Sequence, residues 1–123
     1  MKSLVMNFLR QEGFQPQETP FGIAFKAEGL SYAVLIDEDD SQFLRIALPN
    51  IFDVTAENRV AVLEAINTVN MDMKVSKTCI WGDSVTVFVE QLIDESPELG
   101  DIIPRTLRIM NGTRRSFYKA IEE

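Results

Sequence analysis

The feature that most constrains this chain is a two-residue turn, Glu28-Gly29, between two segments that alternate large and small side chains. Glycine accepts the positive φ that tight hairpin turns require. If these two residues form the loop, residues paired across the strands share one face, and that face is apolar throughout. A one-residue slip would place large side chains opposite small ones, so the register is well specified. The predicted pairs are Ala27–Leu30, Phe25–Tyr32, Ile23–Val34 and Phe21–Ile36.

A third strand over residues 42–48 extends this hairpin to a three-strand meander. Its stronger apolar residues recur at every second position, which is typical of a strand with one buried face. We expect residues 37–41 to form the loop, which places Ile36 opposite Gln42. The residues that then join the buried face are Leu44, Ile46 and Leu48.

One helix is predicted before the meander in the sequence and one after it. The first spans residues 3–12, with Ser3 as its N-cap and Gly13 in the left-handed position of a Schellman motif. The second spans residues 56–70, with Thr55 as its N-cap. Apolar residues cover more than one side of the second helix. We therefore expect it either to lie inside the core or to contact another chain.

The last third of the chain predicts a second hairpin and a final helix. Residues 73–81 and 84–93 pair around Gly82, which suits the first position of a type II′ turn. Neither face of this hairpin is cleanly polar, so we expect one core face and one partly apolar outer face. The final helix runs from its N-cap Asp101 to residue 122, with Pro104 in its first turn.

The composition argues against several classes of function. The chain has 123 residues, no histidine and one cysteine, Cys79, so it lacks the commonest general base and zinc ligand and has no internal disulfide. The net charge of −7 argues against nucleic-acid binding. We see no signal peptide and no apolar run long enough to span a bilayer. The lone cysteine fits a reducing compartment, so we predict a cytoplasmic location.

The charged and nucleophilic residues form no catalytic constellation. The acidic run 37–40 does not match a calcium-binding loop, because Gln42 stands where glycine is invariant, and we interpret it as a solvated loop. Cys79 has no histidine to activate it, so we interpret it as a packed apolar residue. The basic pair Arg114-Arg115 with Lys119 could bind an acidic partner or a phosphate, but the acidic Glu122 and Glu123 at the end of the helix favour a solvated face or interchain ion pairs. We predict no catalytic, metal-binding or cofactor-binding residue and no enzyme activity.

The predicted order is α-β-β-β-α-β-β-α in one α+β domain over residues 1–123, with a five-stranded antiparallel sheet packed by helices. This order resembles the class I type III secretion chaperone fold and, within it, the YbjN-like family of small bacterial proteins. The resemblance covers nearly the whole chain. It lies in Phe8-Leu9 through Gly13-Phe14, Gly22-Ile23-Ala24-Phe25 with Glu28-Gly29 and Tyr32, Phe43-Leu44 through Pro49-Asn50-Ile51, and Asn67-Thr68-Val69-Asn70.

The resemblance implies a non-enzymatic protein that forms homodimers and binds other polypeptides. We therefore predict a chaperone-like or regulatory protein-interaction module. Aspartate at Val62 or Ile66 is then expected to dissociate a dimer without unfolding it. The alternative is a small-ligand-binding protein with a pocket between helix and sheet. The predicted interface residues are Val62, Ile66 and Val69 on the second helix, and Trp81, Phe88 and Leu92 on the second hairpin.

Overall fold

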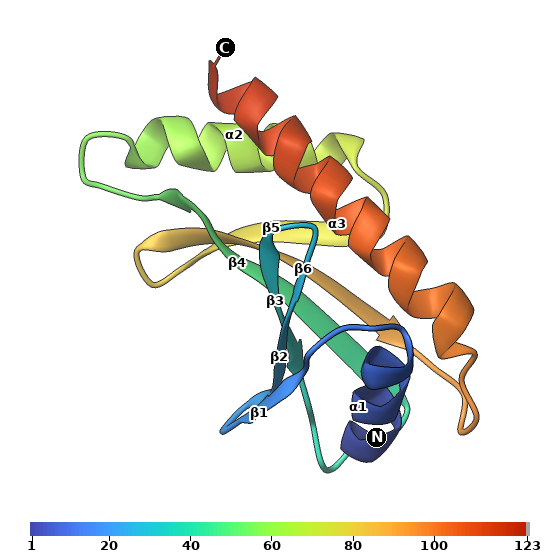
Figure 1. Cartoon of the computed structure of the whole chain (residues 1–123). Helices are drawn as coiled ribbons and strands as arrows, with labels where there is room; N and C mark the ends of the chain where they lie inside the picture. Colours follow the sequence, from blue (N-terminus) through green and yellow to red (C-terminus); the bar gives the residue numbers. More distant parts are fainter. Residues whose placement is uncertain (123) are drawn as a thin grey trace.

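The computed structural model of the protein describes residues 1–122 and is an α+β fold (Figure 1). Its six strands form one antiparallel sheet in the order β1-β2-β3-β4-β6-β5. None of the helices among the described residues is long and apolar enough to cross a membrane. The elements are α1 (Lys2–Gln11), β1 (Gln17–Thr19), β2 (Gly22–Ala27), β3 (Leu30–Leu35), β4 (Phe43–Asp53), α2 (Arg59–Asp72), β5 (Ser76–Trp81), β6 (Ser84–Leu92) and α3 (Leu99–Glu122).

All three helices lie on one side of the sheet (Figure 1). The long helix α3 crosses it, and three side-chain hydrogen bonds, one buried and two partly buried, attach the helix to β4, β5 and β6. Ser76 Oγ lies 2.7 Å from Thr113 Oγ1, and Gln91 Nε2 donates to Thr106 Oγ1 at 3.0 Å. Side chains of α1, α3 and strands β2, β3, β4 and β6 form one core cluster, and side chains of α2, α3 and β6 form a second.

The β2–β3 hairpin has the predicted register, with Phe25 opposite Tyr32 and Ile23 opposite Val34. Both turn residues have positive φ, 51° at Glu28 and 80° at Gly29, as a type I′ turn requires. The rings of Phe25 and Tyr32 stack across the pair at 5.5 Å. The local turn chemistry therefore determined this hairpin.

Two predictions about the meander are wrong in detail. Val34 lies opposite Ile46 rather than Leu44, so the third strand is shifted by two residues from the predicted register. The loop is longer than predicted because the backbone N–H of Gln42 is held by the Asp40 carboxylate at 3.0 Å. Because side chains alternate with a period of two, the shift leaves the predicted apolar residues on the buried face.

The start of the meander also differs. Phe21 was predicted on the buried face, but it is 75% exposed. The hydroxyl of Thr19 accepts hydrogen bonds from the N–H groups of Phe21 and Gly22, which closes a tight turn before β2. The preceding segment forms a short strand, β1, that pairs with β2, so the sheet has six strands and not the predicted five.

Strand β4 continues beyond Leu48, where a break was predicted. It passes through an irregularity at residues 49–51, where Asn50 has a φ of 59°, and pairs again with β6 at Phe52. Between the pairs at Leu48 and at Phe52, the three residues 49–51 of β4 lie opposite the single residue Thr86 of β6, so β4 has two extra residues. Because side chains alternate with a period of two, an even number of extra residues keeps Phe52 on the core side, where it packs with α2.

The predicted helix ends are confirmed at the C-terminus of α1 and at Glu122, the last residue of α3, and differ elsewhere. At the end of α1, Phe14 N–H donates to Leu9 O at 2.9 Å and Gly13 N–H to Arg10 O at 3.1 Å, which is the predicted Schellman motif. Ser3 lies inside α1 and does not cap it. The N-cap of α2 is Asn58 and not the predicted Thr55. The two residues close the turn before the helix, because the Thr55 hydroxyl accepts from the Asn58 N–H and Asn58 Oδ1 accepts from the Thr55 N–H.

Helix α3 starts earlier than predicted, at Leu99. Asp101 is therefore not the N-cap. It lies in the first turn, where its negative charge interacts favourably with the positive end of the helix dipole. Pro104 is the sixth residue of α3 and lies beyond the first turn. The predicted hairpin register of β5 and β6 is confirmed, with Trp81 opposite Ser84 and φ of 66° at Gly82.

Two glycine substitutions should change stability in opposite directions. A Cβ at Gly22 would lie 2.1 Å from the Val34 carbonyl oxygen, so Gly22→Ala should lower the free energy of unfolding by at least about 2 kcal/mol. A Cβ at Gly112 in α3 would meet only Met73 Cε at 3.8 Å, so Gly112→Ala should raise it by up to about 1 kcal/mol. Urea unfolding followed by circular dichroism measures both. If both substitutions changed the free energy of unfolding equally, the close contact at Gly22 and the free space at Gly112 would be contradicted.

Candidate functional site

The side of the sheet away from the helices carries no secondary structure of the described residues, and we call it the open face. Residues paired across neighbouring strands share a face, which identifies its members. Phe88 lies between Ala47 and Lys77, and Glu90 lies opposite Arg45. These residues alternate with the core residues Val87 and Val89 along β6. The large side chains that β3, β4, β5 and β6 place on the open face are Leu35, Phe43, Arg45, Lys77, Trp81, Phe88, Glu90 and Leu92.

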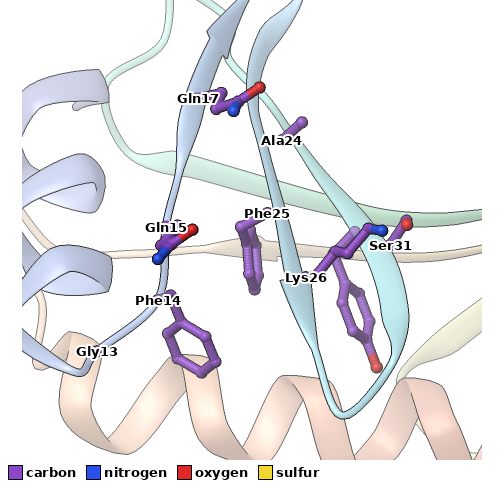
Figure 2. A pocket seen from close by; sticks show the side chains of 9 residues that line it. Gly13, Phe14, Gln15, Gln17, Ala24, Phe25, Lys26 and Ser31 are labelled. Atoms are coloured by element: carbon purple, nitrogen blue, oxygen red, sulfur yellow. The ribbon is translucent and has the colours of Figure 1, made fainter.

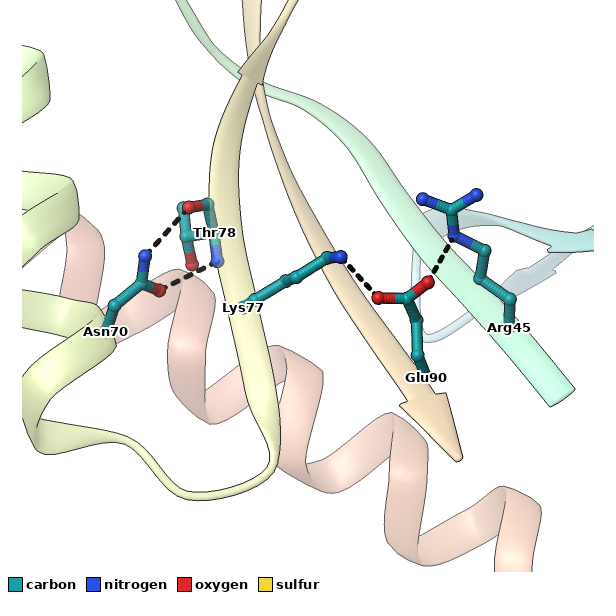
Figure 3. A network of polar contacts seen from close by, with 5 residues as sticks. All are labelled: Arg45, Asn70, Lys77, Thr78 and Glu90. Carbon is teal, nitrogen blue, oxygen red and sulfur yellow. Dashed lines mark hydrogen bonds and ion pairs between the residues drawn. The ribbon is translucent and has the colours of Figure 1, made fainter. Parts of the chain in front are cut away.

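A charged row crosses the open face over three strands (Figure 3). The Glu90 carboxylate forms ion pairs with Arg45, Nε to Oε2 at 3.1 Å, and with Lys77. The Arg45 guanidinium lies 4.8 Å from the centre of the Phe88 ring, which is cation–π geometry. The row therefore covers Phe88, which is only 4% exposed although no helix packs on it.

Apolar side chains beside the charged row are exposed. Trp81 is 54% exposed and lies 5.6 Å from Phe88, ring centre to ring centre. Leu92 is 84% exposed at the other end of β6. Three interface residues were predicted on the second hairpin. Trp81 and Phe88 lie in one cluster, and Leu92 lies on the same face beside Phe43.

The structure places the predicted helix residues elsewhere. Val62 and Val69 are fully buried and Ile66 is 8% exposed, in the cluster that α2 forms with α3. In the folded chain they pack on Phe117 and Val85, so they are not available to a partner. The periodicity of α2 was ambiguous because apolar residues also occupy its outer side, where Val60 is 70% exposed.

Both edges of the sheet are protected against pairing with another strand. At the β5 edge, the side-chain amide of Asn70 binds the backbone of Thr78 twice: Oδ1 accepts from its N–H at 2.8 Å and Nδ2 donates to its carbonyl at 3.0 Å (Figure 3). The other edge strand, β1, has three residues and lies between Pro16 and Pro20. Short strands and prolines both disfavour strand addition.

The other sequence candidates have ordinary surroundings. Cys79 lies in β5 on the open face, partly buried, and burial raises the pKa of its thiol despite the nearby Lys77 and Arg45. The acidic residues 37–40 form an exposed loop, in which Asp37 and Asp40 accept hydrogen bonds from the loop's own backbone.

A groove of about 670 Å³ lies on the helical side, between α3, the end of α1 and the β2–β3 turn. Burial raises the pKa of Tyr32, which lines the floor of the groove, so this hydroxyl stays protonated at neutral pH. The groove could not be predicted from the sequence because its walls come from separate segments. The only sign of it in the sequence is the group of basic residues on the final helix. The groove is lined by Phe8, Glu12, Phe14, Ala27, Glu28, Tyr32, Ile103, Pro104, Leu107, Arg108, Asn111 and Arg115.

Two solved structures share this arrangement over nearly its whole length. YbjN from E. coli, a proposed transcription regulator, superposes with a TM-score of 0.72 over 96% of this chain and 89% of its own. The chain has a YbjN-like fold. An uncharacterized protein from Methanothermobacter thermautotrophicus superposes with a TM-score of 0.69 over 98% of this chain and 96% of its own.

The likeness of this YbjN-like chain to both structures is one of fold. Sequence identity is 8% to YbjN and 12% to the archaeal protein. No protein-family model matches the sequence, and no curated protein is similar to it in sequence. The resemblance to secretion chaperones stays a prediction.

Aspartate at Val62 is now expected to unfold the chain. The substitution buries an unpaired carboxylate at a fully buried site, so Val62→Asp should lower the free energy of unfolding by about 3 kcal/mol or more. The neighbouring Leu63 is 46% exposed, and Leu63→Asp should cost under about 1 kcal/mol. Urea unfolding measures both. If the Val62→Asp protein stays folded, Val62 is not a core residue and its predicted place in an interface would stand.

The Cys79 thiol should react slowly. Burial raises the pKa of this thiol, so the pH midpoint of its alkylation by iodoacetamide should be higher in the folded chain than in the unfolded chain. A series of rates from pH 7 to 10 measures the midpoint, with the urea-unfolded chain as control. A midpoint below that of the unfolded chain would show an activated thiol.

Proposed function

We propose that this YbjN-like protein is a non-enzymatic interaction module that binds another polypeptide through its open face. A second copy of the chain is the first candidate partner. The observation that carries the proposal is that all three helices cover one side of the sheet, while the other side exposes Trp81 and Leu92. Exposed apolar side chains gathered on one face mark association surfaces.

The two protected edges favour binding through the face. A partner that added a strand would need a free backbone edge, and Asn70 occupies the hydrogen-bonding groups of Thr78 at the β5 edge. The open face has no such obstruction. The partner is thus expected to contact side chains and not backbone.

The cluster on the open face has the features of a binding hot spot. Tryptophan and arginine dominate such sites, and rigid side chains lose little entropy on binding. Phe88 is held between Trp81 and the Arg45 guanidinium, and Glu90 holds that guanidinium in place. Leu35 and Phe43 extend the apolar area toward the centre of the sheet.

The same residues give no support to an enzyme. The chain has no histidine, and the pKa of its one thiol is raised, which opposes nucleophilic catalysis. A cytoplasmic location belongs to the proposal, because a free cysteine suits a reducing compartment.

Light scattering coupled to size-exclusion chromatography, over a range of concentrations, tests self-association. We expect a dimer that Leu92→Asp dissociates, because the substitution places a carboxylate on the open face, with a dissociation constant raised by about tenfold or more. Met71→Asp is the matched control, because Met71 is 79% exposed on α2, on the other side of the molecule. Both variants should unfold at the temperature of the wild-type chain.

Two natural reporters make the result specific to the open face. Trp81 is the only tryptophan and Cys79 the only cysteine, and both lie in β5 on this face. Dimer formation should shift Trp81 fluorescence to shorter wavelength and slow Cys79 alkylation. A monomer at every concentration, or a dimer that Met71→Asp disrupts and Leu92→Asp does not, would contradict association through the open face.

A small-ligand-binding protein is the second candidate function. It is favoured by the groove of about 670 Å³ between helix and sheet, a volume typical of ligand sites. Thermal unfolding against a metabolite panel separates the two candidates. A saturable rise in unfolding temperature with one metabolite would favour ligand binding.

A further inference from the structure

We propose that the groove beside α3 binds an amphipathic helical segment of another polypeptide, with acidic side chains of that segment against α3. This site is separate from the open face, on the opposite side of the sheet. Three features support it: a basic stripe on α3, an apolar floor and a far wall of opposite charge.

The basic stripe consists of Arg105, Arg108, Arg115 and Lys119, all exposed. At about 100° per residue their spacing keeps them within an arc of about 80° on one side of the helix. No acidic residue occurs between Ile102 and Ile121. None of the four cations lies within ion-pair distance of a carboxylate of the described residues. Among residues 1–122 the stripe is therefore positive charge without an ion-pair partner, in a chain of net charge −7.

The floor of the groove is apolar and rigid. Phe8, Phe14 and Leu107 line it together with Tyr32. Figure 2 shows Phe14 and Phe25 side by side above α3, and their ring centres are 5.6 Å apart. Phe25 stacks in turn on Tyr32, so three aromatic rings form one continuous packed row. Such a floor accepts the apolar face of a helix, as in other helix-in-groove complexes.

The far wall carries Glu12 at the end of α1 and Glu28 at the β2–β3 turn, both exposed. A ligand that fills the groove thus meets cations along one edge and carboxylates along the other. An amphipathic helix can match both, with acidic residues toward Arg108 and Arg115 and basic residues toward the two glutamates. A nucleic acid or an anionic membrane is uniformly negative and would be repelled by the far wall.

A designed peptide tests the proposal. The probe is a fluorescein-labelled helix of about 18 residues with leucine on one face, glutamate along one edge and lysine along the other. We expect saturable binding by fluorescence anisotropy that weakens with salt. Replacing its glutamates by lysine should weaken binding at least about tenfold, and replacing its leucines by glutamine should abolish it.

Protein variants locate the site. Arg108→Gln with Arg115→Gln should weaken binding about three- to tenfold, the range expected for two exposed charge pairs. Arg59→Gln with Lys74→Gln is the matched control, because it removes two exposed cations elsewhere and should leave binding unchanged. Leu92→Asp on the open face should also leave it unchanged, which separates this site from the proposed function.

Several outcomes would overturn the proposal. The first is equal affinity of the two double variants. The second is equal affinity for the glutamate and lysine peptides. The third is that phosphatidylglycerol vesicles or a single-stranded oligonucleotide bind more tightly than the peptide and that this binding depends on Arg108 and Arg115. The stripe would then belong to a membrane or a nucleic-acid site. Competition of the peptide by one metabolite at lower concentration would assign the groove to a small ligand.

Discussion

The pairing of β4 with β6 is the contact on which the rest of the structure depends. It joins the N-terminal meander to the C-terminal hairpin, so that two locally formed sheets become one. The paired residues are about forty positions apart, so the chain must close a long loop before this ladder forms. The irregularity at residues 49–51 lets one long strand serve both halves of the sheet, and its even excess keeps Leu48 and Phe52 on the same side.

The continuous sheet then determines where the helices lie. Helix α3 is long enough to cross both halves, and its buried threonines bind Gln91 of β6 and Ser76 of β5. With α1 and α2 on the same side, the core is one-sided. This asymmetry produces two surfaces with different chemistry, an apolar open face with a charged row and a helical side with a charged groove.

Both surfaces depend on fixed side chains. On the open face, Glu90 holds Arg45 over Phe88, so a residue without helical cover is nevertheless buried. In the groove, Phe14 and Tyr32 line the floor beside a solvated basic stripe, and the rings of both pack against Phe25. The same fold supports different partners in different proteins, so the function must be argued from these side chains and not from the fold.

The amino-acid sequence by itself determined the local structure: the β2–β3 and β5–β6 registers, the Schellman end of α1 and the α+β class. Turn geometry and short-period alternation are local, so a single sequence contains them. Only the tertiary structure decided the register of β4, its pairing with β6 and the side on which α2 packs. It therefore also decided that Val62 is core while Trp81 is surface, because periodicity identifies an apolar face without identifying what covers it. The groove was decided in the same way, since its cations, carboxylates and aromatic rings meet only when separate segments pack together.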